Sequence, residues 1–97
     1  MLPTGRAKLY WLIDLYASGH HDMRTFCREF EHAYNLEVDR SELSAKEQEV
    51  FGGLFDKVVF YSPYPSELAR IPTYQSAAQI AVAVSDARSK LSVKNEH

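Results

Sequence analysis

The sequence predicts an all-α fold, an antiparallel up-down four-helix bundle. Apolar residues recur with the 3.6-residue period of amphipathic helices in four stretches, and mostly short links join these stretches. Short links make neighbouring helices run in opposite directions. Because 97 residues support one core, we divide the chain into a loose lead-in (1–7), a single four-helix domain (8–91) and a frayed tail (92–97).

The first helix is predicted from about Lys8 to Ser18. Gly19 follows it, at the place where a left-handed C-cap favours glycine. Trp11 and Leu15 lie beside the apolar stripe, and we favour their burial against a second neighbour over an exposed Trp11 that serves as an anchor. The stripe itself consists of Leu9, Leu12, Ile13 and Tyr16.

The second helix is predicted from about Met23 to Tyr34. Asp22 precedes it, and aspartate is one of the residue types that cap helix N-termini well. A polar link that contains three acids, 35–43, follows the helix. The apolar side shows the cleanest helical period in the chain: Met23, Phe26, Cys27, Phe30 and Tyr34.

A capping box marks the start of the third helix. Ser44 precedes Glu47 by three residues, so each side chain can bond to the backbone N–H of the other. Pro63 and Pro65 end the helix because neither has a backbone N–H to donate, and an aromatic, acid-flanked loop begins there. The apolar stripe is Val50, Phe51, Leu54, Phe55, Val58 and Tyr61.

Two glycines, Gly52 and Gly53, interrupt this third helix. Each should destabilise it by about 0.8 to 1 kcal/mol relative to alanine. We favour a neighbouring helix that crosses so closely that no side chain fits. The alternative is a kink that presents the following loop.

Two helical signals follow the prolines. Ser66 and Glu67 predict one short helical turn that ends near Arg70, and a second capping box, Ser76 with Gln79, opens the last helix. The stripe of that helix is rich in small residues, which permit close packing: Ala77, Ile80, Ala81, Val84, Ala87 and Leu91.

The charge distribution favours a basic partner. The net charge is only −2, but from Glu29 to Glu67 nine acidic side chains stand against three basic ones. A nucleic-acid-binding protein would show a dense basic stripe, so we expect no direct nucleic-acid binding. A helix-turn-helix DNA-binding protein is disfavoured for the same reason, since the last two long helices are acidic, apolar or nearly neutral.

Cysteine content and hydropathy predict a cytoplasmic location. The single cysteine, Cys27, cannot form an internal disulfide, which suits a reducing compartment. The first residues lack the apolar core of a signal peptide, and no apolar stretch approaches the roughly 18 residues that span a bilayer. We therefore expect no membrane association.

The chain shows no pattern typical of an enzyme or a metal site. Structural zinc usually needs four ligands in closely spaced pairs, and Cys27, His20, His21 and His32 form no such pair. Cys27 and His32 are five residues apart and point in different directions on a helix, which disfavours a thiol–base couple. We predict no enzymatic activity, no metal and no cofactor, and the role of the three histidines stays open.

The order of several motifs suggests a family. The motifs are an apolar pair before Ser18 and Gly19, the Asp22 cap that leads to Phe26 and Phe30, Leu54-Phe55, Tyr61, the Pro63/Pro65 pair, Glu67-Leu68 and a final capped helix. From about Leu9 to Leu91, this order resembles the colicin D immunity protein family. These are small bacterial self-protective proteins that also occur beside contact-dependent inhibition toxins.

The resemblance implies a four-helix bundle that binds the basic C-terminal nuclease domain of a cognate toxin. Such a toxin cleaves tRNA or other RNA, and the immunity protein blocks its active site with acidic side chains in place of RNA phosphates. This chain departs from the family just ahead of Tyr61 and between the prolines, where acids are expected. It has Val58, Val59, Phe60 and Tyr64 there, which predicts a more aromatic contact.

The acidic segment and the aromatic loop together supply the predicted partner-binding residues. For each acid, the alternative is a solvated helix face or a turn cap, and Glu47 is assigned to its cap. The alternative function is a non-enzymatic adaptor that docks through the Tyr-Pro loop, and a homodimer stays open. The predicted partner-binding residues are Asp39, Glu42, Glu49, Asp56, Tyr61, Tyr64 and Glu67.

Overall fold

The computed structural model describes the backbone of residues 2–93 and the side chains of residues 2–91. Within that range there is no strand, and an isolated bridge joins Tyr61 to Gln75. The all-α prediction is confirmed. The frayed tail was predicted from residue 92, but α5 continues to Val93, and residues 94–97 lie outside the described residues. The elements are α1 (Gly5–Ala17), α2 (Met23–His32), the π-helix η1 (Ala33–Glu37), the 3₁₀-helix η2 (Arg40–Glu42), α3 (Ala45–Val58), α4 (Pro65–Arg70) and α5 (Ala77–Val93).

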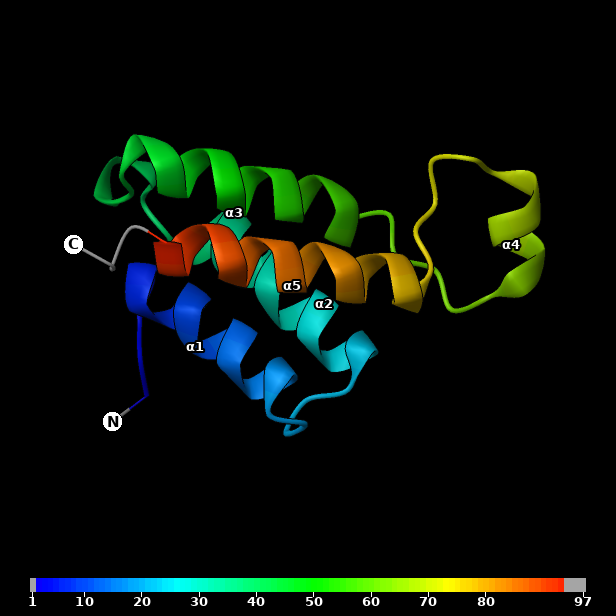
Figure 1. Ribbon diagram of the computed structural model, residues 1–97, viewed down its shortest axis with the longest axis horizontal. Helices are drawn as coiled ribbons and strands as arrows, with labels where there is room; N and C mark the ends of the chain where they lie inside the picture. The colour runs from blue at the N-terminus through cyan, green and yellow to red at the C-terminus, as the bar shows by residue number, and fades with distance from the viewer. Residues whose placement is uncertain (1, 94–97) are drawn as a thin grey trace.

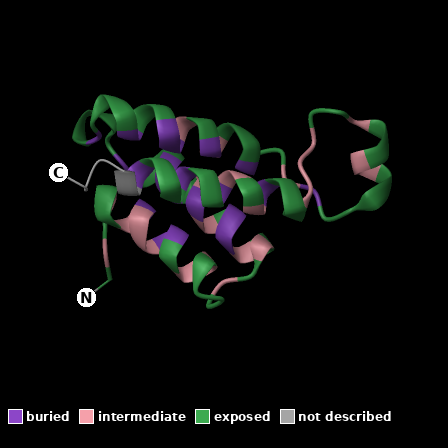
Figure 2. Cartoon of the chain, viewed as in Figure 1, coloured by how far each residue is buried: buried purple, intermediate pink, exposed green. Residues whose placement is uncertain are grey.

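The long helices form two packed pairs. Figure 1 shows α3 and α5 side by side and running in opposite directions, while α1 packs against α2, which in turn contacts α3. The short helix α4 projects at one end of the long axis of a molecule that measures 43 × 29 × 26 Å. None of its residues is buried (Figure 2). No helix in the described range is long and apolar enough to cross a membrane.

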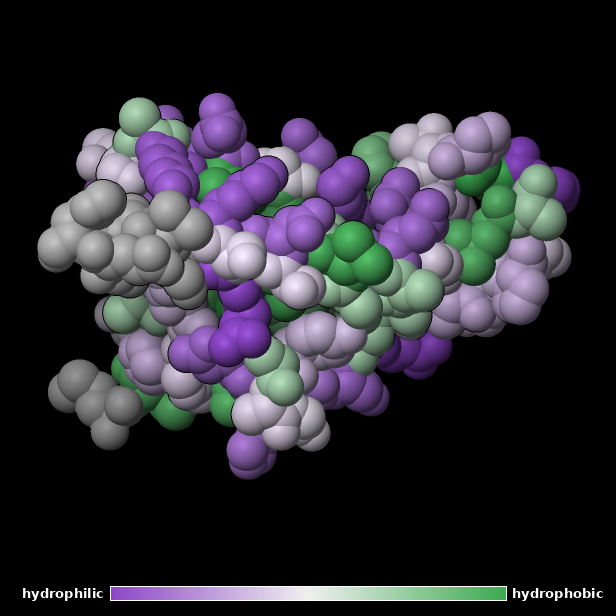
Figure 3. Space-filling view, viewed as in Figure 1, coloured by the Kyte–Doolittle hydropathy of each residue, from purple (hydrophilic) through white to green (hydrophobic). Residues whose placement is uncertain are grey.

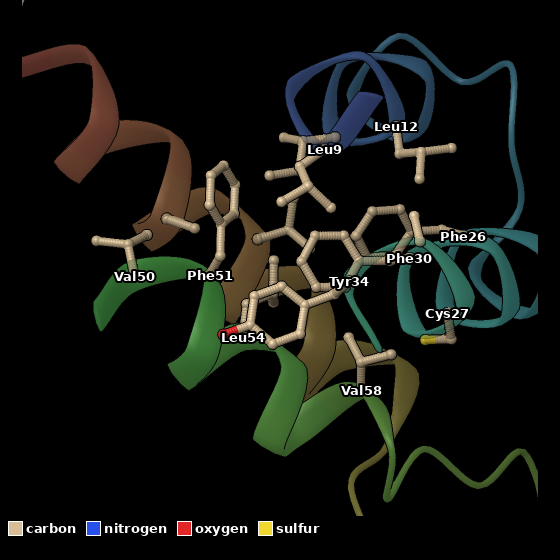
Figure 4. Packing of buried hydrophobic residues seen from close by; sticks show 14 of the residues in the cluster. Leu9, Leu12, Phe26, Cys27, Phe30, Tyr34, Val50, Phe51, Leu54 and Val58 are labelled. Carbon is tan, nitrogen blue, oxygen red and sulfur yellow. The ribbon is translucent and has the colours of Figure 1, made fainter. Parts of the chain in front are cut away.

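A cluster of aromatic rings fills the core between the two pairs. The Phe30 ring lies 5.5 Å from Phe26, 6.1 Å from Tyr34 and 6.2 Å from Phe51, measured between ring centroids. Figure 4 shows these rings between α1, α2 and α3. The predicted stripes supply most of the buried residues, and Trp11 and Leu15 are partly buried against the core, as favoured.

Several predicted helix ends are correct. The Asp22 side chain caps α2 by accepting from the Thr25 N–H at 2.8 Å. Both capping boxes form, at the start of α3 and at Ser76 before α5. Gly19 has a φ of +85°, the left-handed conformation expected after α1.

Three helix boundaries differ from the prediction. The helix α3 ends at Val58, ahead of Tyr61 and of the two prolines that were expected to end it, and Pro65 starts α4 instead. The helix α1 begins at Gly5 rather than Lys8, because Arg6 in its first turn pairs with Glu47 of α3. The helix α2 ends at His32, and the chain widens into the π-helix η1, whose C-terminal bond runs from the Val38 N–H to the Ala33 carbonyl. The apolar period through Tyr34 is the same in both conformations, so it did not reveal the change.

The α1–α3 contact contains a buried carboxylate. Glu47 is 1% exposed, and both of its oxygens accept from the Arg6 Nε, at 2.9 and 2.8 Å. It also accepts from the Tyr10 hydroxyl and from the Ser44 backbone N–H. The bonds from Arg6, aided by the other donors, hold the pKa of Glu47 well below its ordinary value, while burial and Glu47 raise the pKa of Tyr10 to about 12.

The two helix glycines have different surroundings, and the expected close crossing of a neighbouring helix is wrong for Gly53. The difference gives a paired stability prediction. A Cβ on Gly52 would lie 3.2 Å from the Tyr34 hydroxyl, whereas a Cβ on Gly53 would meet no atom within 4 Å. We expect Gly53→Ala to raise the free energy of unfolding by about 0.8 kcal/mol through helix propensity, and Gly52→Ala to give no such gain. Urea unfolding of both variants tests this, and equal effects at the two positions would contradict it.

Candidate partner-binding surface

A groove of about 510 Å³ runs between α3 and α5. Small and apolar residues line it, among them Gly53, Ala83 and Ala87. Three carboxylates and two lysines line it as well, namely Glu49, Asp56, Asp86, Lys57 and Lys90. In Figure 3, hydrophobic surface lies between hydrophilic side chains where the two helices run side by side.

The aromatic loop joins the end of this groove. The Gln75 N–H donates to the Phe60 carbonyl at 2.9 Å, and the Ser62 N–H donates to the Gln75 carbonyl at 3.0 Å. These bonds hold the loop against residues 73–75, and Phe60, Thr73 and Gln75 line the groove there. The groove and the loop therefore form one continuous surface.

A short polar network shapes the turn that carries Tyr64. The buried Ser62 hydroxyl donates to Glu67 at 2.6 Å and accepts from the Tyr64 N–H at 3.1 Å. Pro65 then starts α4, where its missing N–H has no helical partner to lose. As a result, the Tyr64 side chain is 57% exposed.

The structure gathers only some of the seven predicted residues. Glu49 and Asp56 line the groove, and Tyr61 is half-buried against the core at its end. Tyr64 and Glu67 belong to the projecting segment around α4, but Glu67 has the structural role of accepting from Ser62. Asp39 caps η2 and Glu42 is its last residue, at the opposite end of the long axis (Figure 1). The seven residues thus do not form one compact patch.

Asp39 also has a local structural role, and Glu42 lies close to the start of α1. The Asp39 carboxylate accepts from the backbone N–H and the hydroxyl of Ser41, and these bonds lower its pKa. Glu42 approaches Gly5, where a Cβ would lie 3.0 Å from its carboxylate. The alternative of a turn cap, weighed from the sequence, therefore describes Asp39 well.

Part of the acidic excess is neutralised across the fold. Arg6 pairs with Glu47 at 2.7 Å and Lys8 pairs with Glu37 at 2.8 Å, and both bases lie outside the acidic segment of the sequence. Glu49 and Asp56 form no ion pair with any described residue. The carboxylates of the groove are therefore among those that can meet an external basic group.

Sequence reasoning missed the contribution of α5 to this surface. Asp86 and Lys90 line the groove from α5, Phe60 lines it from the loop, and Val82 is 62% exposed beside it. One signal was present: Asp86 and Lys90 are four residues apart, which places them on the same side of a helix. The periodicity of the buried stripe drew attention to the adjacent, buried side of the helix, which shares only Ala87 with the groove.

Cys27 and the histidines form no reactive cluster among residues 2–91. The Cys27 thiol is buried, donates to the Met23 sulfur at 3.6 Å, and has its pKa raised to about 12 by burial and, to a smaller extent, by Glu31. His32 is exposed and lies 3.2 Å from Glu37. No three His, Cys, Asp or Glu side chains in the described range are arranged to hold a metal ion.

Comparison with family models, curated proteins and solved structures finds no match to this chain. The resemblance to the colicin D immunity proteins therefore rests on the residues quoted for it.

Proposed function

We propose that this protein is a non-enzymatic, cytoplasmic immunity-type inhibitor. It binds the basic C-terminal domain of a cognate bacterial toxin, a domain that cleaves tRNA or other RNA, and blocks its active site. We also propose that the helices form an up-down four-helix bundle and that the chain is related to the colicin D immunity proteins. The observation that carries it is the groove between α3 and α5, where unpaired carboxylates surround an apolar floor beside an exposed aromatic loop.

This combination suits an inhibitor that must act before its target finds substrate. Carboxylates around a site attract a basic surface from a distance and can raise the association rate constant towards about 10⁸ M⁻¹s⁻¹ at low salt. Exposed aromatic side chains such as Phe60 and Tyr64 then exclude water and slow dissociation. Charge thus governs the encounter, and apolar contact governs the lifetime of the complex.

A growth assay tests the proposed function. The C-terminal domain of the protein encoded immediately upstream of this chain should arrest growth when it is produced alone, and production of this chain should restore growth. A purified pair should also form a complex in pull-down. An inhibitory upstream domain that this chain neither binds nor neutralises would contradict the proposal.

Charge reversal in the groove gives a kinetic prediction. We expect Glu49→Lys combined with Asp56→Lys to slow association with the toxin domain by at least about tenfold at low salt, because both substitutions remove electrostatic attraction and add repulsion. The difference from wild type should shrink as salt rises, since salt screens exposed charges. Stopped-flow mixing over a range of salt concentrations measures both effects.

Asp14→Lys is the matched charge control for each of these reversals. Asp14 is exposed on α1 and only approaches Arg88, at 4.0 Å, so it tests the effect of net charge away from the groove. Glu67→Lys is unsuitable as a binding test, because Glu67 accepts from the buried Ser62 and its loss would disturb the loop. Equal rates for wild type and the groove double variant would reject the assigned surface.

The second candidate is an adaptor that docks an unrelated protein through the Tyr-Pro loop. The projection of α4 from the end of the molecule and the exposure of Tyr64 favour it (Figure 1). It predicts no growth rescue from any neighbouring toxin. It also predicts that Tyr64→Ala abolishes partner capture while the groove double variant captures the partner normally.

A further inference from the structure

The floor of the α3–α5 groove contains a glycine that packing within the chain does not explain. Gly52 faces the Tyr34 hydroxyl, but a side chain on Gly53 would enter open space. Glycine in a helix interior destabilises by about 0.8 to 1 kcal/mol relative to alanine, so α3 is less stable here without any gain in internal packing. What the missing side chain provides is depth in the groove.

The opposite wall is also built from small residues. Ala83 and Ala87 of α5 line the groove across from Gly53, and Val50 and Leu54 add apolar surface. A second depression of about 460 Å³ continues over α5 and shares Ala83, Lys57 and Asp86 with the first. The apolar surface of the groove therefore continues towards exposed Val82.

The charges around this floor form no ion pairs among residues 2–91. They are those of Glu49, Asp56, Lys57, Asp86 and Lys90. The carboxylates come from both walls, with Asp56 on α3 and Asp86 on α5. Both helices therefore present a carboxylate to the groove.

We infer that this groove receives an arginine side chain of the partner, with its apolar stem over Gly53 and its guanidinium between Asp56 and Asp86. The three-carbon stem of arginine suits an apolar floor, and its five N–H donors suit carboxylates on two walls. Lys57 and Lys90 would repel a purely basic segment, so the arginine stands within an otherwise apolar surface. The inference rests on the proposed function and names its central contact.

Filling the groove floor tests this arrangement on the intact chain. We expect Gly53→Leu to weaken binding of the upstream-encoded toxin domain at least about 30-fold in calorimetry, the loss typical of an anchor contact. Gly53→Ala should weaken it less while making the free protein more stable. Opposite changes in stability and affinity are not expected of a glycine that only shapes the helix. Ser85→Leu, on an exposed part of α5 outside the groove, is the matched control and should bind normally.

Replacing surface arginines of the toxin domain one at a time by lysine tests the arginine itself. For one of these arginines, the lysine substitution should weaken binding to the wild-type chain but not to Asp86→Asn. The two changes are coupled because the two residues share a contact. Wild-type affinity for both Gly53 variants would overturn the inference and leave the proposed function intact. A toxin domain that does not bind the wild-type chain would overturn both. A concentration-dependent dimer that Gly53→Leu abolishes would also overturn the inference, because a second copy would then occupy the groove.

Discussion

Replacing Glu47 by glutamine should lower the free energy of unfolding by about 3 kcal/mol, since removing one member of a buried, hydrogen-bonded charge pair typically costs about 3 to 5 kcal/mol. We take the lower value because the Arg6 side chain is about half exposed. Glutamine has the same size but only one acceptor oxygen, so it cannot accept from Arg6, Tyr10 and Ser44 together. In a domain of this length, the midpoint of thermal unfolding should fall by roughly 15 °C.

The same carboxylate predicts how stability depends on pH. Its pKa in the folded state lies below the ordinary value of 4.5, so its contribution is fully present above about pH 4.5 and is lost as pH falls towards the folded pKa. Wild type should therefore lose stability faster than Glu47→Gln between about pH 4.5 and 2. Glu49→Gln, an exposed neutralisation on the same helix, should change stability by less than about 0.5 kcal/mol. Parallel pH profiles for wild type and Glu47→Gln would contradict this account of the α1–α3 contact.

Truncating Phe30 to alanine should lower the free energy of unfolding by about 4 kcal/mol, because it removes a fully buried ring and leaves a cavity. The cavity would lie among Phe26, Tyr34 and Phe51, whose rings all contact Phe30. Phe60→Ala makes the same chemical change at a 40% exposed position and should cost less than about 1 kcal/mol. Chemical unfolding compares the two, and equal losses would contradict the position of the core.

Because Phe30 lies in the core and Phe60 lines the groove, their substitutions should affect folding and binding differently. Phe60 lines the groove, so Phe60→Ala should weaken the toxin complex while the free protein stays folded. Phe30→Ala should weaken the toxin complex only because a smaller fraction of the protein is folded.

The helices were predictable because local signals and burial agree in them. Capping boxes, the Asp22 cap and the apolar stripes depend on residues that are close together in sequence. All of them are present in the structure as expected. The start of α1 was harder to predict from the sequence, because Arg6 in its first turn bonds to Glu47, 41 residues away. Non-local ion pairs leave no periodic signal.

The candidate surface was predictable only in part, for the same reason. Acidic excess in the sequence identified Glu49 and Asp56, but it also counted Glu47 and Glu37, whose charges are met by Arg6 and Lys8 from the first helix. The groove itself exists only because α5 lies beside α3, so the role of Asp86 required the tertiary contact. Charge counted along the chain thus overestimates the charge that a partner meets.

Hydrogen–deuterium exchange of the chain with and without the upstream-encoded toxin domain tests the central claim most directly. Binding should slow exchange in residues 49–60 and 82–90, which border the groove, and leave α1 and α2 unchanged. Protection confined to α1 and α2, with the groove helices exchanging as in the free chain, would contradict the account.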